Sequence, residues 1–267
     1  MTDSPAHYSA DQISDLLLGE LRSRQQLGEL MLTCLTRVLP ALTVLRAEEF
    51  LKHGIGRRLK LMRRCIEQVY EIYPPSRTTF LSWEELEDLQ VYLQAFVINV
   101  AGILDNFAWV IVVERSLEAV IGGRKKVGLF IPATQRYLPA PLNDYITSST
   151  ISHWYNVYAK EYRDALAHRI PLYVPPRLLN TGTDEHTRLQ DLSTRRGEAI
   201  VARDFQLADK LESEEESIGK PCPYFMHSFS EGNNARPVMF HPQVNADAST
   251  IIEIGNKFSQ IWTTTTD

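Results

Sequence analysis

The chain has 267 residues and a mass of 30.5 kDa; 44% of its residues are hydrophobic and 23% are charged. This composition is typical of a soluble globular protein and excludes a chain that is disordered throughout. The 28 basic and 33 acidic residues give a net charge of −5, which excludes a globally basic nucleic-acid binder but not a local basic patch. Three widely spaced cysteines, Cys34, Cys65 and Cys222, exclude a disulfide scaffold and are expected to be buried thiols.

One segment, residues 91–113, is long and apolar enough to suggest a membrane span. Four polar residues interrupt it, and a central aspartate such as Asp105 costs roughly 2.5–3.5 kcal/mol in a bilayer. We therefore predict a buried central helix and no membrane partner. Residues 1–14 lack the basic and apolar regions of a signal peptide, so a cytoplasmic location is expected.

Helical periodicity and proline positions predict the elements of the first two-thirds of the chain. A first helix is capped by Asp11 or Ser14 and interrupted at Pro40. A second covers residues 42–73, with a break at 53–56, and ends before Pro74 and Pro75. A third covers 83–121 and starts with a capping box formed by Ser82 and Glu85. After a long loop over 124–143, a fourth helix begins at Ser148 or Ser149, ends near His168 and is followed by extended chain.

In the last third of the chain, the sequence does not predict the long apolar helices of the first two-thirds. Residues 181–216 hold ten acids and five bases, which fits a solvated helix or a linker-like arm. Residues 221–230 and 236–243 resemble strands around a turn at 231–234, and a short amphipathic helix covers 250–262. The prediction is a mainly α protein: a bundle of about four long helices with a small C-terminal β-hairpin and a terminal helix. We place a domain boundary between 1–178 and 179–267.

The motif search singles out one segment. Within this sequence there is no P-loop, nucleophile elbow, zinc-protease motif or metal-spaced His/Cys cluster, so neither a metal nor a cofactor is expected. In residues 154–176, Arg163 is followed by Asp164 and, four residues after that, by His168, where Pro171 forces the helix to end. The two side chains diverge on a regular helix, but a distorted last turn would let them face one cleft. A histidine can take a proton from a 2′-hydroxyl, and an arginine can stabilise charge on the attacked phosphate.

These residues resemble the RX4–6H motif of the HEPN superfamily, over roughly residues 42–176. The resemblance implies a helical bundle, a homodimer in which two motifs meet, and in many members a metal-independent endoribonuclease of toxin–antitoxin, phage-defence or RNA-processing systems. Arg163 and His168 would then be catalytic, with Asp164 as their supporting polar residue. RNA and a cognate antitoxin protein would be the partners.

Two other segments have the same kind of spacing. Arg236 and His241 lie in a predicted strand, where an odd separation places side chains on opposite faces. Arg46 and His53 can share a helix face, but no polar residue follows Arg46 and no proline ends the helix. Arg163 and His168 also have a purely structural interpretation, as cations that stabilise a helix C-terminus.

Two polar residues and a basic segment elsewhere in the chain are predicted to support this site. Asp105 and Asn106 would either line the cleft beside Arg163 or form a hydrogen-bond network in the core. A basic segment in residues 52–64 would hold the RNA backbone, or would be a solvated face paired with the acidic arm. The predicted RNA-binding residues are Arg57, Arg58, Lys60, Arg63, Arg64 and Arg169. The rival hypothesis is a non-catalytic helical module that binds nucleotide, RNA or a protein.

Overall fold

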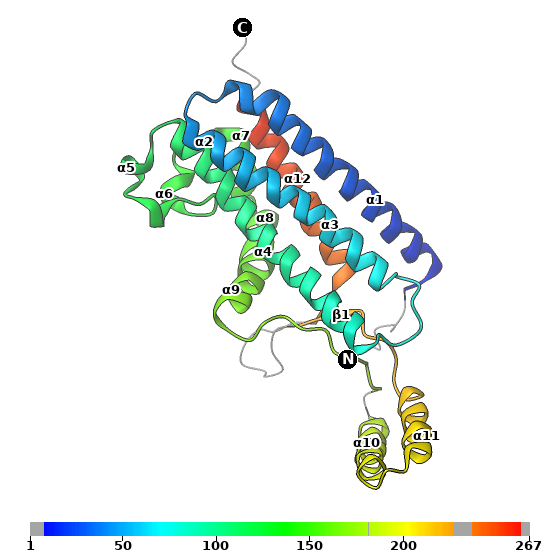
Figure 1. Cartoon of the computed structure of the whole chain (residues 1–267). Coiled ribbons are helices and arrows are strands. Elements are labelled where there is room, and N and C mark those ends of the chain that lie inside the picture. Colours follow the sequence, from blue (N-terminus) through cyan, green and yellow to red (C-terminus); the bar gives the residue numbers. More distant parts are fainter. Residues whose placement is uncertain (1–7, 181, 227–236, 263–267) are drawn as a thin grey trace.

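A computed structural model describes residues 8–180, 182–226 and 237–262 of the chain. The protein is mainly α-helical, with one two-stranded sheet, which confirms the predicted fold class (Figure 1). The long helices lie side by side, with α4 and α12 at the centre of the bundle. The helices are α1 (Ala10–Thr33), α2 (Leu45–Glu49), α3 (Gly56–Ile72), α4 (Trp83–Glu114), α5 (Glu118–Ile121), α6 (Pro132–Gln135), α7 (Ala140–Thr147), α8 (Ser149–Trp154), α9 (Lys160–His168), α10 (Glu185–Val201), α11 (Phe205–Glu216) and α12 (Phe240–Gln260).

Local signals account for several helix ends. Ser82 and Glu85 form the predicted capping box at the start of α4, and α3 ends directly before Tyr73 and the two prolines. The first helix starts earlier than predicted, because Ser9 rather than Asp11 or Ser14 is its N-cap and forms a capping box with Gln12. The predicted long loop over 124–143 is also corrected, since it contains α6 and the start of α7.

A short π-helical segment lies near the predicted break at 53–56, and another interrupts the fourth helix, which was predicted to be unbroken. Residues Phe50–Ile55 join α2 to α3, and Tyr155–Ala159 join α8 to α9, so each pair forms one continuous rod. The extra residue in a π turn shifts the side chains that follow around the helix axis. This shift matters at α9, where it helps to set which side chains face α4.

The centre of the bundle is α4. It is the one helix in the described ranges that is long and apolar enough to cross a membrane, by length and composition only. Most of its apolar window is buried, with Phe96, Ile103 and Phe107 among the fully enclosed side chains. The three cysteines are buried free thiols, as predicted.

The terminal helix does not follow the predicted domain boundary at residue 178. The helix α12 begins at Phe240, ten residues before the predicted start, and Phe240, Ile251 and Phe258 belong to the same core as α1, α3 and α4. Residues 236–243 were predicted as a strand, but only Val238–Met239 (β2) is extended; it pairs antiparallel with Tyr224–Phe225 (β1). The predicted turn at 231–234 and Arg236 lie outside the described residues.

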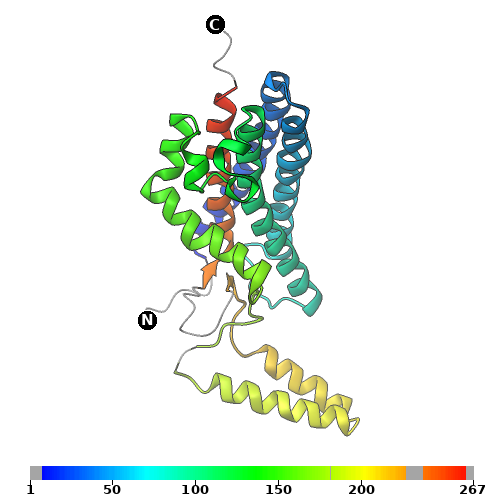
Figure 2. The same cartoon turned by 90° about the vertical axis from the view of Figure 1, so that its left-hand side faces the viewer.

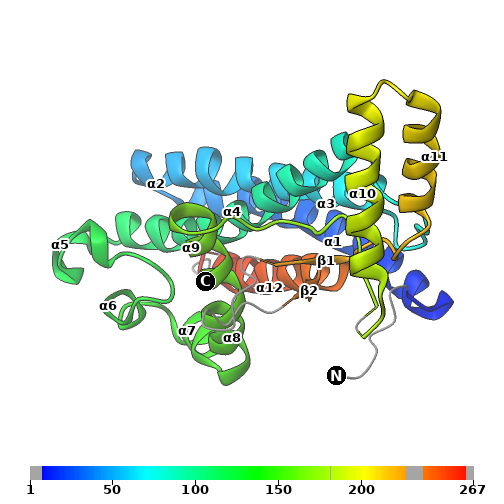
Figure 3. The ribbon, with the colours of Figure 1, turned by 90° about the horizontal axis from the view of Figure 1, so that it is seen from below.

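The charge-dense segment is a helical hairpin. Its helices α10 and α11 lie side by side and project from the bundle at the end away from the C-terminus (Figures 2 and 3). The arm has its own small apolar cluster, which includes Leu192, Ala199 and Leu211. At its base, the Arg177 guanidinium donates to the backbone carbonyls of Glu215 and Ile218 at 2.6 and 3.1 Å.

Candidate nucleic-acid interface

A cavity of about 530 Å³ lies between α4, the segment 124–131 and the rod formed by α8 and α9. We call it the cationic cavity. Its floor includes Asp105 from the middle of α4, and Phe130 stacks on Tyr155 in its wall with ring centroids 3.8 Å apart. Its basic lining residues are Arg58, Arg124, Lys125, Lys160 and Arg163. Five cations around one carboxylate make the cavity suited to anions.

Arg58 reaches this cavity because α4 has a glycine where α3 crosses it. A Cβ atom on Gly102 would lie 2.3 Å from Cζ of Arg58, so a larger residue would displace the guanidinium. Nε of Arg58 donates to Oδ1 of Asn106 at 2.9 Å, and Nη1 donates to Oδ1 of Asn99 at 3.2 Å. Burial lowers the pKa of Arg58, and the carboxylate of Asp105 opposes that shift. Since arginine keeps its charge in proteins, Arg58 supplies a fixed cation.

Asp105 lies between two of the cations. Within the described residues no hydrogen bond or ion pair to its carboxylate is found. Surrounding protein atoms raise the pKa of the Asp105 carboxyl by desolvation, while Arg163 and Arg58 act in the opposite direction. Its placement agrees with the predicted cleft beside Arg163.

Arg163 lines the cavity from α9, and its Nε lies 3.1 Å from Oδ1 of Asp164. The two neighbours therefore pair with each other. The Arg163 side chain is two-fifths exposed and lines the cavity, so it is accessible to a ligand.

His168 is not part of the cavity. It is the last residue of α9 and is exposed, and α9 stays helical up to it; the first distorted backbone is at Arg169. The helix therefore keeps the divergence of roughly 140° that a five-residue step produces. The predicted meeting of Arg163 and His168 in one cleft does not occur within a single chain. Arg169 also lies outside the cavity and pairs with Glu161 at 2.9 Å.

The basic segment of α3 does not form a single cationic face. Arg58 points toward α4, whereas Arg63 lies against Gly28 of α1. Arg57, Lys60 and Arg64 are exposed, and Arg64 pairs with Glu67 at 2.8 Å. The spread follows from helical periodicity, which distributes the five cations of α3 over more than one side of the helix.

The acidic arm does not cover this segment in the described structure. Glu212 and Glu215 pair with Arg196 inside the arm, at 3.0 and 3.2 Å. The acids that do pair with the basic segment are Glu48 and Glu67, from the same rod.

A second pocket, of about 500 Å³, shares Arg58 with the cationic cavity. It is lined by Arg46, His53, Arg57 and Asn106, so Asn106 serves this pocket rather than the cleft beside Arg163. Sequence reasoning missed Arg124, Lys125 and Lys160. Arg124 and Lys125 belong to the predicted long loop over 124–143, and the signal in the sequence that could have found them is the pair of glycines directly before them.

Neither a metal-binding group in the described part of the chain nor a similar protein identifies the site. Among the described residues there is no group of three or more His, Cys, Asp or Glu side chains that could hold a metal ion. Comparison of the chain with protein-family models, with curated proteins and with solved structures gave no match.

Proposed function

We propose that this protein binds RNA, with the phosphates of the strand held in the cationic cavity. The observation that carries the proposal is the convergence of Arg58, Arg124, Lys125, Lys160 and Arg163 on one cavity whose only acidic lining residue in the described structure is Asp105. Phosphate contacts supply most of the sequence-independent affinity for nucleic acid, and they do not require a basic protein overall. The proposal retains the HEPN resemblance as a hypothesis.

The test removes two cavity cations. We expect Lys160→Ala with Arg163→Ala to weaken binding of a single-stranded RNA at least about tenfold at low salt, and to reduce the slope of log K against log salt by about 1.4, because each lost phosphate contact removes about 0.7. Fluorescence anisotropy over a salt series measures both quantities.

The control is a charge-matched variant, Arg136→Ala with Lys210→Ala, whose two exposed cations lie outside the cavity. It is expected to bind like the wild type. Equal weakening in both variants would show that total charge, and not the cavity, attracts the RNA.

A second candidate function is metal-independent RNA cleavage. The observation that favours it is that His168 is exposed at the end of α9, a little more than one turn from the Arg163–Asp164 pair, where a second molecule can reach it. His168 would exchange protons with the 2′-hydroxyl or the leaving oxygen, and Arg163 would stabilise the phosphorane-like transition state. Both groups would have to come together between two chains.

Cleavage of mixed RNA in EDTA, with end-group analysis, separates the two functions. A nuclease is expected to leave 2′,3′-cyclic phosphate ends, and His168→Ala is expected to lower the rate by about 10²–10⁴ without changing RNA affinity or thermal unfolding. Binding with no cleavage would identify a non-catalytic module. An antitoxin partner and a cytoplasmic location stay predictions.

A further inference from the structure

The first helix and the π-helical segment Cys34–Val38 that continues it are apolar on two faces. One face, which includes Leu27, Leu30 and Cys34, is buried against α3 and α12. The other carries large apolar side chains that are 40% to 60% exposed: Leu17, Leu18, Leu21, Leu32 and Leu35. An amphipathic surface helix normally shows a polar outer face, so this second set, which we call the α1 leucine stripe, is unusual for a helix exposed to water.

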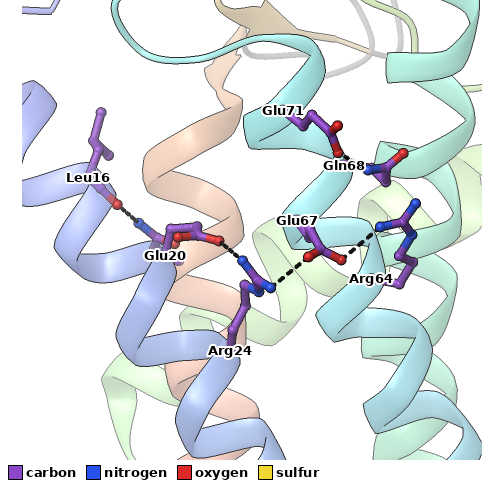
Figure 4. A network of polar contacts seen from close by, with 8 residues as sticks. Leu16, Glu20, Arg24, Arg64, Glu67, Gln68 and Glu71 are labelled. Carbon is purple, nitrogen blue, oxygen red and sulfur yellow. Dashed lines mark hydrogen bonds and ion pairs between the residues drawn. The ribbon is translucent and has the colours of Figure 1, made fainter.

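Polar contacts fix the rotation of α1 on the bundle. Arg24 pairs with Glu20 of α1 at 2.8 Å and with Glu67 of α3 at 2.7 Å, and the side chain of Asn245 in α12 donates to the carbonyl of Leu16 at 3.2 Å (Figure 4). The buried face is already packed on these two helices. The leucine stripe therefore cannot turn inward and stays exposed in the single chain.

Four leucines of the stripe lie symmetrically about a point between residues 26 and 27. The row of positions that faces outward runs through Leu18, Leu21, Gln25, Gly28, Leu32 and Leu35, at steps of 3, 4, 3, 4 and 3. Gly28 lies at its edge, against Arg63 of α3, and Leu35 lies in the π-helical segment Cys34–Val38 that continues α1. Alternating steps of three and four are the spacing of helix pairs that pack side by side. About a two-fold axis between residues 26 and 27, Leu18 meets Leu35 of another copy and Leu21 meets Leu32. A surface that matches itself under two-fold rotation is what an isologous dimer requires.

Two charges near the ends of the rod also favour the antiparallel arrangement. Asp15 and Arg37 are exposed at opposite ends of the rod, and among the described residues neither belongs to an ion pair. Antiparallel pairing of two copies brings Asp15 of each to the level of Arg37 of the other, whereas parallel pairing would bring like charges to the same level.

We propose that two copies of this chain associate through the α1 leucine stripe, with their first helices antiparallel. In Figure 1, α1 and α9 lie on opposite sides of the bundle, so this dimer keeps the two α9 helices apart and is a different pairing from the one that RNA cleavage between two chains would need. The inference rests on the exposure of α1 and not on the proposed function, and it gives the dimer two separate RNA-binding sites.

Sedimentation over a range of micromolar concentrations tests the surface. We expect the wild type to be a dimer, and Leu21→Glu or Leu32→Glu to raise the dimer dissociation constant at least about thirtyfold, because each puts two charges into the apolar seam. Both side chains are exposed, so the fold tolerates the change. Leu45→Glu, at a leucine that is 70% exposed outside the stripe, is the matched control and should remain dimeric. A monomeric wild type, or a dimer that survives both stripe variants, would overturn the proposal.

Cysteine crosslinking tests the direction of pairing. Leu18→Cys with Leu35→Cys is expected to give an intermolecular disulfide on mild oxidation, since the three native cysteines are buried. Leu18→Cys alone should give none, because the two copies of residue 18 would lie about 25 Å apart. A crosslink from the single variant would contradict the antiparallel arrangement. RNA affinity, measured on the same samples, reports separately on the cavity.

Discussion

At pH 8 the variant Asp247→Asn is expected to have a free energy of unfolding up to about 4 kcal/mol greater than the wild type, and this advantage is expected to vanish near pH 4. Asp247 is buried in α12, where its Oδ1 accepts hydrogen bonds from Nε1 of Trp154 at 2.7 Å and from Nε2 of Gln243 at 2.6 Å. Burial raises the pKa of its carboxyl to about 7, although both donors favour the charged form. Asparagine keeps the acceptor oxygen and never becomes charged.

The sign of this pH dependence follows from which state of the protein, folded or unfolded, binds more protons. Unfolded Asp247 titrates near its ordinary pKa of 3.8, so between about pH 4 and pH 7 the folded chain binds more protons than the unfolded chain. The contribution of this group to stability is therefore lost as the pH rises through that window. Above pH 7 the wild type buries a carboxylate, which is costly without a paired cation.

Urea unfolding at a series of pH values, followed by tryptophan fluorescence, measures this effect. Asp144→Asn is the control, because Asp144 is exposed and the same substitution there leaves the shape of the pH curve unchanged. If the wild type and Asp247→Asn gave parallel curves from pH 4 to pH 8, Asp247 would not titrate in the folded protein.

The fold was predictable where local chemistry decides it. The capping box at Ser82 and Glu85 and the stop at Pro74 depend on neighbouring residues, and the structure has both. The start of α12 could not be predicted, because residues 240–249 become helical through packing of Phe240, Val244 and Ala248 into the core. Pro242 is compatible with that start, since a first turn does not need its N–H.

The candidate site was predictable only in part. The sequence indicated Arg163 and Asp164, which are neighbours in one predicted helix. It also indicated Asp105, a polar residue within the apolar segment 91–113. It did not indicate that Gly102 admits Arg58, or that segment 124–131 returns to α4, because both depend on contacts between distant segments. His168 was expected to turn toward Arg163 in a distorted last turn, but α9 remains regular through that residue.

A second buried group gives the opposite pH dependence. His241 has no exposed surface; its Nε2 donates to the carbonyl of Tyr73 at 2.7 Å, and its Nδ1 accepts from the hydroxyl of Tyr8 at 3.2 Å. The rings of Tyr70 and Phe240 pack against it. Burial lowers the pKa of His241 to about 3, so the folded protein holds it neutral.

We expect His241→Gln to remove up to about 5 kcal/mol of acid destabilisation between pH 6.5 and pH 3. Unfolded His241 binds a proton below its ordinary pKa of 6.5, whereas the folded form does so only near pH 3, so this contribution to stability is lost as the pH falls through that range. Glutamine retains a donor for the Tyr73 carbonyl but fills less space, so the variant is expected to be about 1–3 kcal/mol less stable at pH 7.

The two variants together test both assignments. Between about pH 4 and pH 6.5 the Asp247 and His241 contributions have opposite slopes and largely cancel in the wild type. Asp247→Asn should therefore lose stability steeply on acidification, His241→Gln should gain stability over the same range, and the double variant should be nearly flat. Unfolding curves at matched pH values measure the three slopes. A double variant that kept the slope of either single variant would show that another buried group dominates the acid response.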